Sequence, residues 1–89
     1  MHKTEVKIIN KLGLHARAAT KFVQLCAKHD SKITVNDGMR SVNGKSIIGL
    51  MTLAARQGTV LSIQADGVDE RELLHSLQEL ITGKFGEPA

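Results

Sequence analysis

The sequence predicts an α+β protein of 89 residues with the element order β-α-β-β-α-β-α. Three observations carry this prediction. Apolar residues alternate in three short segments, which is the period of a strand with one buried face. They recur at every third or fourth position in three other segments, which is the period of an amphipathic helix. An Asn-Asp-Gly turn joins two of the strands directly. We therefore expect one sheet with helices on one face and water on the other.

The first third of the chain is expected to form a strand and then a helix. Residues 5–9 alternate, with Val6 and Ile8 on one face. After a loop, residues 16–28 carry one apolar stripe at helical spacing. The members of that stripe are Ala19, Phe22, Val23 and Cys26. Because Cys26 lies on the stripe and is the one cysteine of the chain, we expect a buried thiol and no intramolecular disulfide.

A hairpin and a short helix are expected in the middle of the chain. Residues 32–35 and 39–42 are strands on either side of the Asp-Gly turn, because this dipeptide tolerates the positive φ of tight turns. Ser46 is a favourable N-cap residue for a second helix that runs to about Ala54.

The last third of the chain is expected to form a strand, a helix and a loose tail. Residues 60–65 alternate, and Asp69 and Glu72 have the spacing of a capping box at the start of a helix. Gly83 is expected to end this helix. The apolar stripe of the helix consists of Leu73, Leu74, Leu77, Leu80 and Ile81. The tail, residues 86–89, is expected to be loose.

Composition limits the possible functions. The length suits a single domain, residues 1–89, with one modest core. No apolar run reaches the roughly 18 residues of a membrane span, and no signal peptide is present, so we expect a cytoplasmic protein. A net charge of +3 with no Tyr or Trp argues against nucleic-acid binding. Since His2, His29 and His75 lack metal-ligand spacing, we expect neither a metal nor a cofactor.

The octapeptide from Gly13 to Thr20 is the most informative segment. It places His15 at the start of a helix, where free backbone N–H groups and the helix dipole stabilise an anion such as phosphate. Histidine is nucleophilic near neutral pH, and Arg17 adds a cation beside it. From these residues alone, two interpretations stay open: a site that holds a phosphoryl group, or a surface histidine that caps the helix.

The second helix is apolar nearly all the way round. The residues expected to face the core are Leu50, Leu53 and Ala54, and those expected on other faces are Ile47, Ile48 and Met51. Exposed apolar residues that lie together indicate a docking surface, whereas a more deeply buried helix is the alternative. Ser46 is either a plain helix cap or a hydroxyl that can be modified.

Residues 10–19, NKLGLHARAA, resemble the active-site signature of the HPr family, the histidine-containing phosphocarriers of the bacterial phosphoenolpyruvate-dependent phosphotransferase system. Residues 42–54 and 65–70 resemble two further segments of the same family. Length, element order and spacing agree over nearly the whole chain. The resemblance implies an HPr-like open-faced β-sandwich, with a four-stranded antiparallel sheet and three helices on one face.

The resemblance implies a phosphoryl carrier rather than a stand-alone enzyme. His15 would accept a phosphoryl group on Nδ1 from enzyme I and pass it to an enzyme IIA domain, and Arg17 would help to hold and release it. Ser46 matches the regulatory site of HPr kinase/phosphorylase. The partner-binding residues that the resemblance implies are Ala16, Thr20, Gln24, Ile47, Ile48 and Met51. We expect the carrier to be a monomer that is not inserted in a membrane.

One position departs from the family pattern, because Ala18 stands where the family usually has proline. Alanine still favours the helix and leaves one more N–H near the phosphate. The sequence does not separate the sugar-transport carrier from its nitrogen-related paralogue. Two other classes stay open. One is a regulatory module that docks partners through the second helix without phosphoryl transfer, and the other is a dimeric ligand-binding domain of the ferredoxin-like kind.

Overall fold

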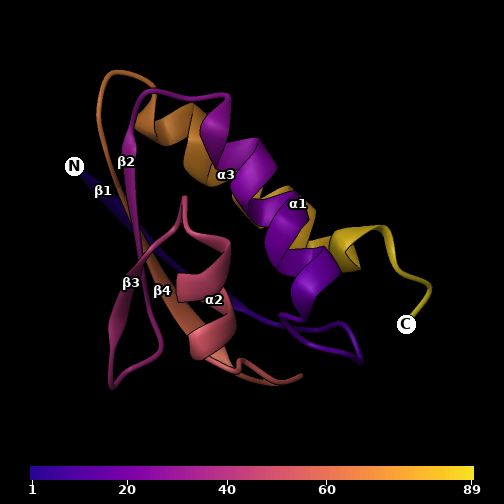
Figure 1. Cartoon of the computed structure of the whole chain (residues 1–89). Coiled ribbons are helices and arrows are strands. Elements are labelled where there is room, and N and C mark those ends of the chain that lie inside the picture. The colour runs from indigo at the N-terminus through magenta and orange to yellow at the C-terminus, as the bar shows by residue number, and fades with distance from the viewer.

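A four-stranded antiparallel sheet forms one layer of the protein (Figure 1). The computed structural model describes all of residues 1–89, and the strand order in its sheet is β1-β4-β2-β3. The strands are β1 (His2–Lys7), β2 (Lys32–Asn36), β3 (Ser41–Asn43) and β4 (Val60–Asp66). In the centre of the sheet, Ile63 of β4 lies opposite Thr4 of β1 on one side and Val35 of β2 on the other.

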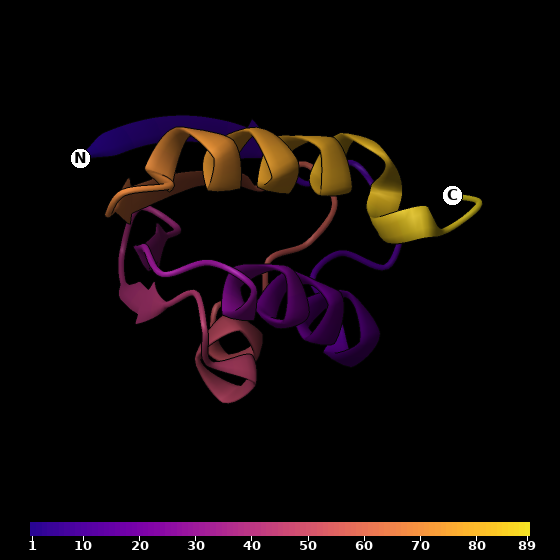
Figure 2. The ribbon, with the colours of Figure 1, turned by 90° about the horizontal axis from the view of Figure 1, so that it is seen from above.

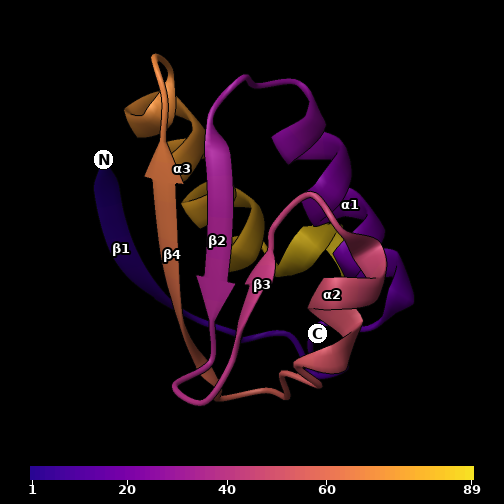
Figure 3. The same ribbon diagram turned by 60° about the vertical axis from the view of Figure 1, so that its left-hand side comes forward.

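Three helices cover one face of this sheet, and Figure 3 shows the sheet in front of α3. They are α1 (Ala16–Ala27), α2 (Ile47–Thr52) and α3 (Glu70–Thr82), followed by a 3-10 turn, η1 (Lys84–Gly86). The helix α1 packs against both other helices, and α3 also packs against β1 and β4. Since α1 and α3 run side by side in opposite directions, the start of α1 lies at the same end of the molecule as the C-terminal tail (Figure 2).

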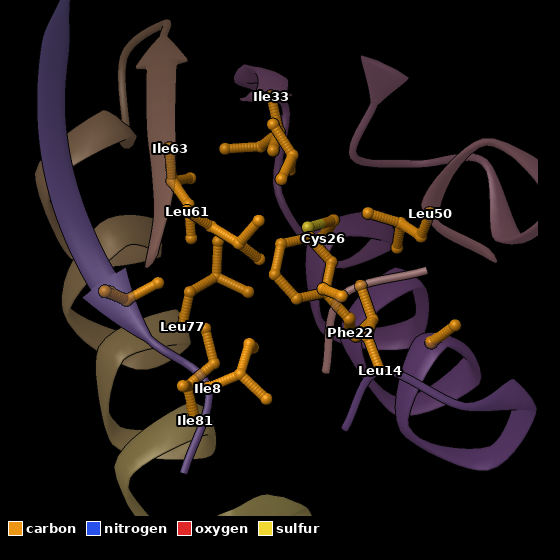
Figure 4. Close-up of a cluster of buried hydrophobic side chains, with 14 of the residues drawn as sticks. Ile8, Leu14, Phe22, Cys26, Ile33, Leu50, Leu61, Ile63, Leu77 and Ile81 are labelled. Atoms are coloured by element: carbon orange, nitrogen blue, oxygen red, sulfur yellow. The ribbon is translucent and has the colours of Figure 1, made fainter. Parts of the chain in front are cut away.

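The core lies between the sheet and the helices (Figure 4). Ile8, Phe22, Leu61 and Leu77 meet there, and each is at most 1% exposed. Cys26 is also fully buried, and burial raises the pKa of its thiol to about 12. The buried thiol that the helical stripe predicts is therefore confirmed. No helix has the length and apolar character that a membrane span needs.

The element order and the antiparallel sheet agree with the prediction, but two strands differ in detail. Strand β1 covers His2–Lys7 rather than residues 5–9, because its pairing with β4 runs from His2 to Lys7. Strand β3 begins at Ser41 rather than Met39. The carboxylate of Asp37 accepts hydrogen bonds from the backbone N–H groups of Met39 and Arg40, each over 2.9 Å. These bonds hold both residues in the turn, so Met39 is 94% exposed and the strand is shorter than expected.

The end of the second helix was also predicted wrongly. Helix α2 stops at Thr52, and Ala54 adopts a left-handed backbone with φ 50°. This turn exposes Ala54 and buries Ala55 in its place. Leu50 and Leu53 are buried as expected.

The predicted capping box at the start of α3 does not form. Asp69 lies at the N-cap position but makes no side-chain bond to its own helix. Its carboxylate instead accepts hydrogen bonds from the hydroxyl and backbone N–H of Ser31 and from the backbone N–H of Asp30. Glu72 is exposed, and Glu70 accepts from the backbone N–H of Gly67 over 3.3 Å. Asp69 therefore joins α3 to the loop before β2.

The C-terminal tail is fixed, contrary to the expectation of a loose end. Phe85 in η1 is 1% exposed and belongs to the core. The ammonium group of Lys21 on α1 donates to the Phe85 carbonyl oxygen over 2.5 Å, and the backbone N–H of Lys11 donates to the Ala89 carbonyl oxygen over 3.1 Å. The tail therefore packs on the start of α1.

Candidate functional site

His15 is the N-cap residue of α1. Its backbone is extended, with φ −77° and ψ 178°, and its Nδ1 accepts a hydrogen bond from the backbone N–H of Arg17 over 3.3 Å. Its carbonyl oxygen accepts from the N–H of Ala19 over 2.8 Å, which begins the helix. The imidazole is 28% exposed. The capping role is confirmed, and it leaves the ring accessible to a partner.

A closed turn positions His15 from the N-terminal side. The side-chain amide of Asn10 donates to the Gly13 carbonyl oxygen over 2.8 Å, and the Gly13 N–H donates to the Asn10 carbonyl oxygen over 3.2 Å. Asn10 is fully buried, and Leu14 is 4% exposed and belongs to the core. The loop before His15 is therefore anchored at both ends.

The tail supplies a carboxylate to His15. The Oε2 atom of Glu87 lies 2.5 Å from Nε2 of His15, and Oε1 accepts from the side-chain amide of Asn10 over 3.0 Å. Burial raises the pKa of the Glu87 carboxyl, but the hydrogen bonds from His15 and Asn10 and the nearby charge of Lys21 lower it, and the net pKa is below its usual value. Glu87 is therefore ionised at neutral pH.

Sequence reasoning missed Glu87, because it treated the tail as loose. The one local signal was Phe85, an aromatic residue beyond the predicted end of α3, which indicates that the chain returns to the core there. A shallow hollow surrounds His15, and its lining residues are Lys11, Leu12, Arg17, Glu87, Pro88 and Ala89.

The donors beside His15 are free. The Arg17 side chain is exposed and makes no ion pair or hydrogen bond within the protein, and the backbone N–H groups of Ala16 and Ala18 have no hydrogen-bond partner either. Ala18 is buried, and α1 begins at Ala16 without a proline in its first turn, as expected. Unpaired N–H groups and a guanidinium at a helix N-terminus form an arrangement that binds phosphate.

Ser46 occupies the N-cap of α2, as predicted. Its hydroxyl accepts a hydrogen bond from the backbone N–H of Gly49 over 3.0 Å. The side chain is partly exposed at the start of the helix. Ser46 is therefore a helix cap whose hydroxyl oxygen is not sealed in the core.

An apolar patch on α2 lies exposed. Ile47 is 38%, Ile48 78% and Met51 45% exposed, whereas Leu50 between them is buried. This pattern confirms the exposed face that the sequence indicates and excludes a fully buried helix. The adjacent helix α1 presents Ala16 and Gln24 as exposed residues and Thr20 as a partly exposed one. No His, Cys, Asp and Glu side chains gather in a cluster that could hold a metal ion.

The fold and the capping histidine together define a small helix-on-sheet protein with an accessible histidine at a helix N-terminus. A family model described as the PTS HPr component phosphorylation site matches residues 2–83. The phosphocarrier protein HPr of Neisseria meningitidis is 52% identical over 87 residues, which cover 98% of each chain. The chain therefore belongs to the HPr family of phosphocarrier proteins of the phosphotransferase system.

Solved structures agree with this assignment. HPr-C-His from Thermoanaerobacter tengcongensis superposes with a TM-score of 0.95 at 45% identity, and the match covers 100% of both chains. An HPr dimer from the same organism gives a TM-score of 0.78 at 46% identity and covers 98% of this chain and 100% of that chain. The predicted open-faced sandwich is confirmed, and the ferredoxin-like alternative is wrong.

Proposed function

We propose that this protein accepts a phosphoryl group on Nδ1 of His15 from phosphorylated enzyme I and passes it to enzyme IIA domains. The observation that carries the proposal is the cluster of free donors at the start of α1. Nδ1 already faces the backbone N–H of Arg17 at 3.3 Å, and the exposed Arg17 guanidinium and the N–H of exposed Ala16 have no partner within the protein. These donors stabilise the charge of a phosphoryl group bound to Nδ1.

The transfer needs no base in this protein. The lone pair of Nδ1 attacks phosphorus, a new N–P bond forms, and the bond between phosphorus and the donor group of enzyme I breaks with its electron pair returning to that group. In the second transfer the same steps run from His15 to the acceptor group of the IIA domain. Because the imidazole is 28% exposed and its hollow is shallow, partner residues reach the phosphorus directly.

The exposed patch on α2 is the proposed docking surface for both partners, together with Ala16, Thr20 and Gln24 of α1. Ile48 and Met51 supply apolar contact area, and the net charge of +3 favours association with acidic partners. Brief association suits a carrier that binds a donor and an acceptor in turn.

Ser46 is the proposed regulatory site for an HPr kinase/phosphorylase. A phosphate on this N-cap residue lies where the helix dipole favours negative charge, so α2 is expected to stay folded. The same phosphate adds about two negative charges beside Ile47 and Ile48. We therefore propose that it blocks docking by repulsion and desolvation.

We further propose a cytoplasmic monomer. Enzyme I is charged by phosphoenolpyruvate, which is a metabolite of the cytoplasm. A related HPr has been solved as a dimer, so the oligomeric state is a direct test. Light scattering at micromolar concentration should give the 9.7 kDa of one chain. A mass of twice that value would contradict the monomer.

Incubation with enzyme I and phosphoenolpyruvate, followed by intact-mass analysis, tests the carrier function. We expect one acid-labile phosphate in the native protein, none in His15→Ala, and one in the control His75→Ala, which removes an exposed histidine of α3. Discharge by sugar-type and nitrogen-type IIA domains then separates the two branches. Absence of phosphate with both the sugar-type and the nitrogen-type enzyme I would contradict the carrier function. It would favour a docking module without phosphoryl transfer.

A further inference from the structure

We infer that Glu87 is a positioning residue for His15, whose carboxylate holds the hydrogen on Nε2 and keeps the lone pair of Nδ1 free for the phosphoryl group. The inference deepens the proposed carrier function and rests on it. Glu87 lies outside residues 2–83, the part of the chain that the family model matches.

The first contact is with the imidazole itself. Oε2 of Glu87 lies 2.5 Å from Nε2, and the Glu87 side chain is 11% exposed. An ionised carboxylate only accepts hydrogen bonds, so Nε2 must be the donor. On the opposite side of the ring, Nδ1 accepts the Arg17 N–H. Both sides of the ring therefore select the same tautomer, with the hydrogen on Nε2 and the lone pair on Nδ1.

Asn10 holds the carboxylate in place. Its side-chain amide uses both hydrogens, one to Oε1 of Glu87 over 3.0 Å and one to the Gly13 carbonyl oxygen over 2.8 Å. Asn10 is fully buried, and its Oδ1 atom has no partner. Rotating the amide by 180° would place Oδ1 against the Gly13 carbonyl oxygen and Oε1 of Glu87, which are both acceptors. The Asn10 side chain therefore presents a fixed donor to Glu87.

The tail itself is anchored at Phe85. This ring is 1% exposed in the core, and its carbonyl oxygen accepts from Lys21 over 2.5 Å. Glu87 follows two residues later and contacts His15, and the C-terminus lies at the end of the molecule where α1 begins (Figure 2). The carboxylate is thus held from two sides, by the buried aromatic ring and by Asn10.

This geometry matches what phosphoryl transfer demands of the ring. When neutral Nδ1 forms its bond to phosphorus, the ring gains a positive charge and keeps the hydrogen on Nε2. The Glu87 carboxylate then faces a cation and stabilises it. No proton leaves His15 in the step, and none has to return when the phosphoryl group departs to an acceptor.

The variant Glu87→Gln tests the inference, because it exchanges one acceptor oxygen for a donor. The fixed N–H of Asn10 takes the remaining oxygen, so the new NH₂ faces Nε2 of His15 and favours the tautomer with the hydrogen on Nδ1. The opposite arrangement would leave a buried donor of Asn10 unpaired, which is unfavourable. The competing Arg17 N–H is at the surface and can bond to water.

Nitrogen-15 spectra of the imidazole at a pH where the ring is neutral measure the tautomer directly. We expect the hydrogen on Nε2 in the native protein and a shift toward Nδ1 in Glu87→Gln. Phosphoryl acceptance from enzyme I should fall by about tenfold or more at saturating carrier, since the rate scales with the fraction of rings that keep the lone pair on Nδ1. The KM for the carrier should stay close to the native value.

Two further variants separate the effect of Glu87 on His15 from a general effect of replacing a glutamate. Glu79→Gln is the matched control, because Glu79 lies 2.6 Å from Nε2 of His75 in an exposed pair on α3. It should leave His15 unchanged. Adding Asn10→Ala to Glu87→Gln frees the glutamine oxygen to turn toward His15 and should restore the hydrogen on Nε2.

An unchanged His15 tautomer in folded Glu87→Gln overturns the inference, whatever the transfer rate. A slower rate without a tautomer change overturns it too, because it shows a merely structural role. The spectra need no phosphorylation, so they stand apart from the carrier assay. If the native protein takes no phosphate, the proposed function fails, while the tautomer result still judges Glu87.

Discussion

The backbone N–H of Leu14 donates to the carbonyl oxygen of Ala55 over 2.8 Å. Both residues are buried, and the bond ties the loop before His15 to the segment that follows α2. This hydrogen bond therefore connects the proposed phosphoryl site to the proposed docking helix. A change in this connection should affect both.

Gly13→Ala should disturb this connection strongly. Gly13 has φ 70°, and a Cβ there would lie 2.4 Å from the same Ala55 oxygen. The left-handed backbone and the steric clash together should lower the free energy of unfolding by about 2–4 kcal/mol, as measured in urea. Gly38→Ala is the control, since Gly38 has φ 100° and open space at its Cβ. Equal losses in the two variants would rule out the clash.

Arg17→Ala should slow phosphoryl transfer without preventing phosphorylation of His15. The guanidinium has no partner within the protein, so its removal should change the free energy of unfolding by less than about 0.5 kcal/mol. Loss of a charged hydrogen bond to the phosphoryl group should reduce the rate by about tenfold to a hundredfold. Rapid-quench assays measure this rate. Lys28→Ala, at the other end of α1, should transfer at the native rate.

Ile48→Glu should weaken docking. Ile48 is 78% exposed, so its replacement should leave the free energy of unfolding within about 0.5 kcal/mol of the native value. A charge in the centre of an apolar contact should raise the KM of enzyme I for the carrier by about tenfold or more. Val68→Glu changes a residue that is 96% exposed and lies before α3. If both variants raised the KM equally, the effect would come from net charge rather than from the α2 surface.

Ser46→Ala and Ser46→Asp should separate the two roles of Ser46. Alanine removes the bond to the Gly49 N–H and should lower the free energy of unfolding by about 1 kcal/mol. Aspartate keeps an acceptor at the N-cap, so circular dichroism should show native helix content while transfer from enzyme I slows. Loss of helix in Ser46→Asp would mean that a charge here acts by unfolding α2.

Asp69→Asn should change the acid dependence of stability. The hydrogen bond from the Ser31 hydroxyl, opposed by burial and assisted by the N–H groups of Asp30 and Ser31, holds the pKa of Asp69 below its usual 3.8. A carboxyl with a lowered folded pKa stabilises the protein above the unfolded pKa, and this contribution is lost as pH falls through the folded pKa.

Urea unfolding between pH 7 and pH 2 measures this effect. At pH 7 the native protein should have a larger free energy of unfolding than Asp69→Asn. This difference in free energy should become smaller below pH 3.8. Glu72→Gln removes an exposed carboxylate of the same helix turn and should stay within about 0.5 kcal/mol of the native protein at pH 7. If the difference in free energy between the native protein and Asp69→Asn were the same at all pH values, it would contradict a role for the negative charge of Asp69.

Local sequence patterns predicted most of the fold, because the spacing of apolar residues in a helix or a strand indicates which side chains are buried. They predicted the helix start at His15, the cap at Ser46 and the exposed face of α2. They failed where a contact joins distant parts of the chain. Asp69 has the spacing of a local cap, yet the N–H groups of Ser31 and Asp30 compete for the same oxygens.

The same limit explains why Glu87 was missed. It meets His15 across 72 positions of sequence, and a short polar tail carries no periodicity that could indicate such a contact. Ala54 shows a second limit. Its φ of 50° ends α2 two residues early and moves burial to Ala55, although both residues are alanine and look equivalent in the sequence.

The burial of Cys26 makes the protein well suited to site-specific labelling. Its thiol is inaccessible and has a pKa of about 12, so it should not react with maleimides while the protein is folded. A cysteine introduced at exposed Gln24 would then be the one reactive thiol, and a fluorophore attached there would report the approach of each partner to α1 in real time. The natural cysteine can stay in place.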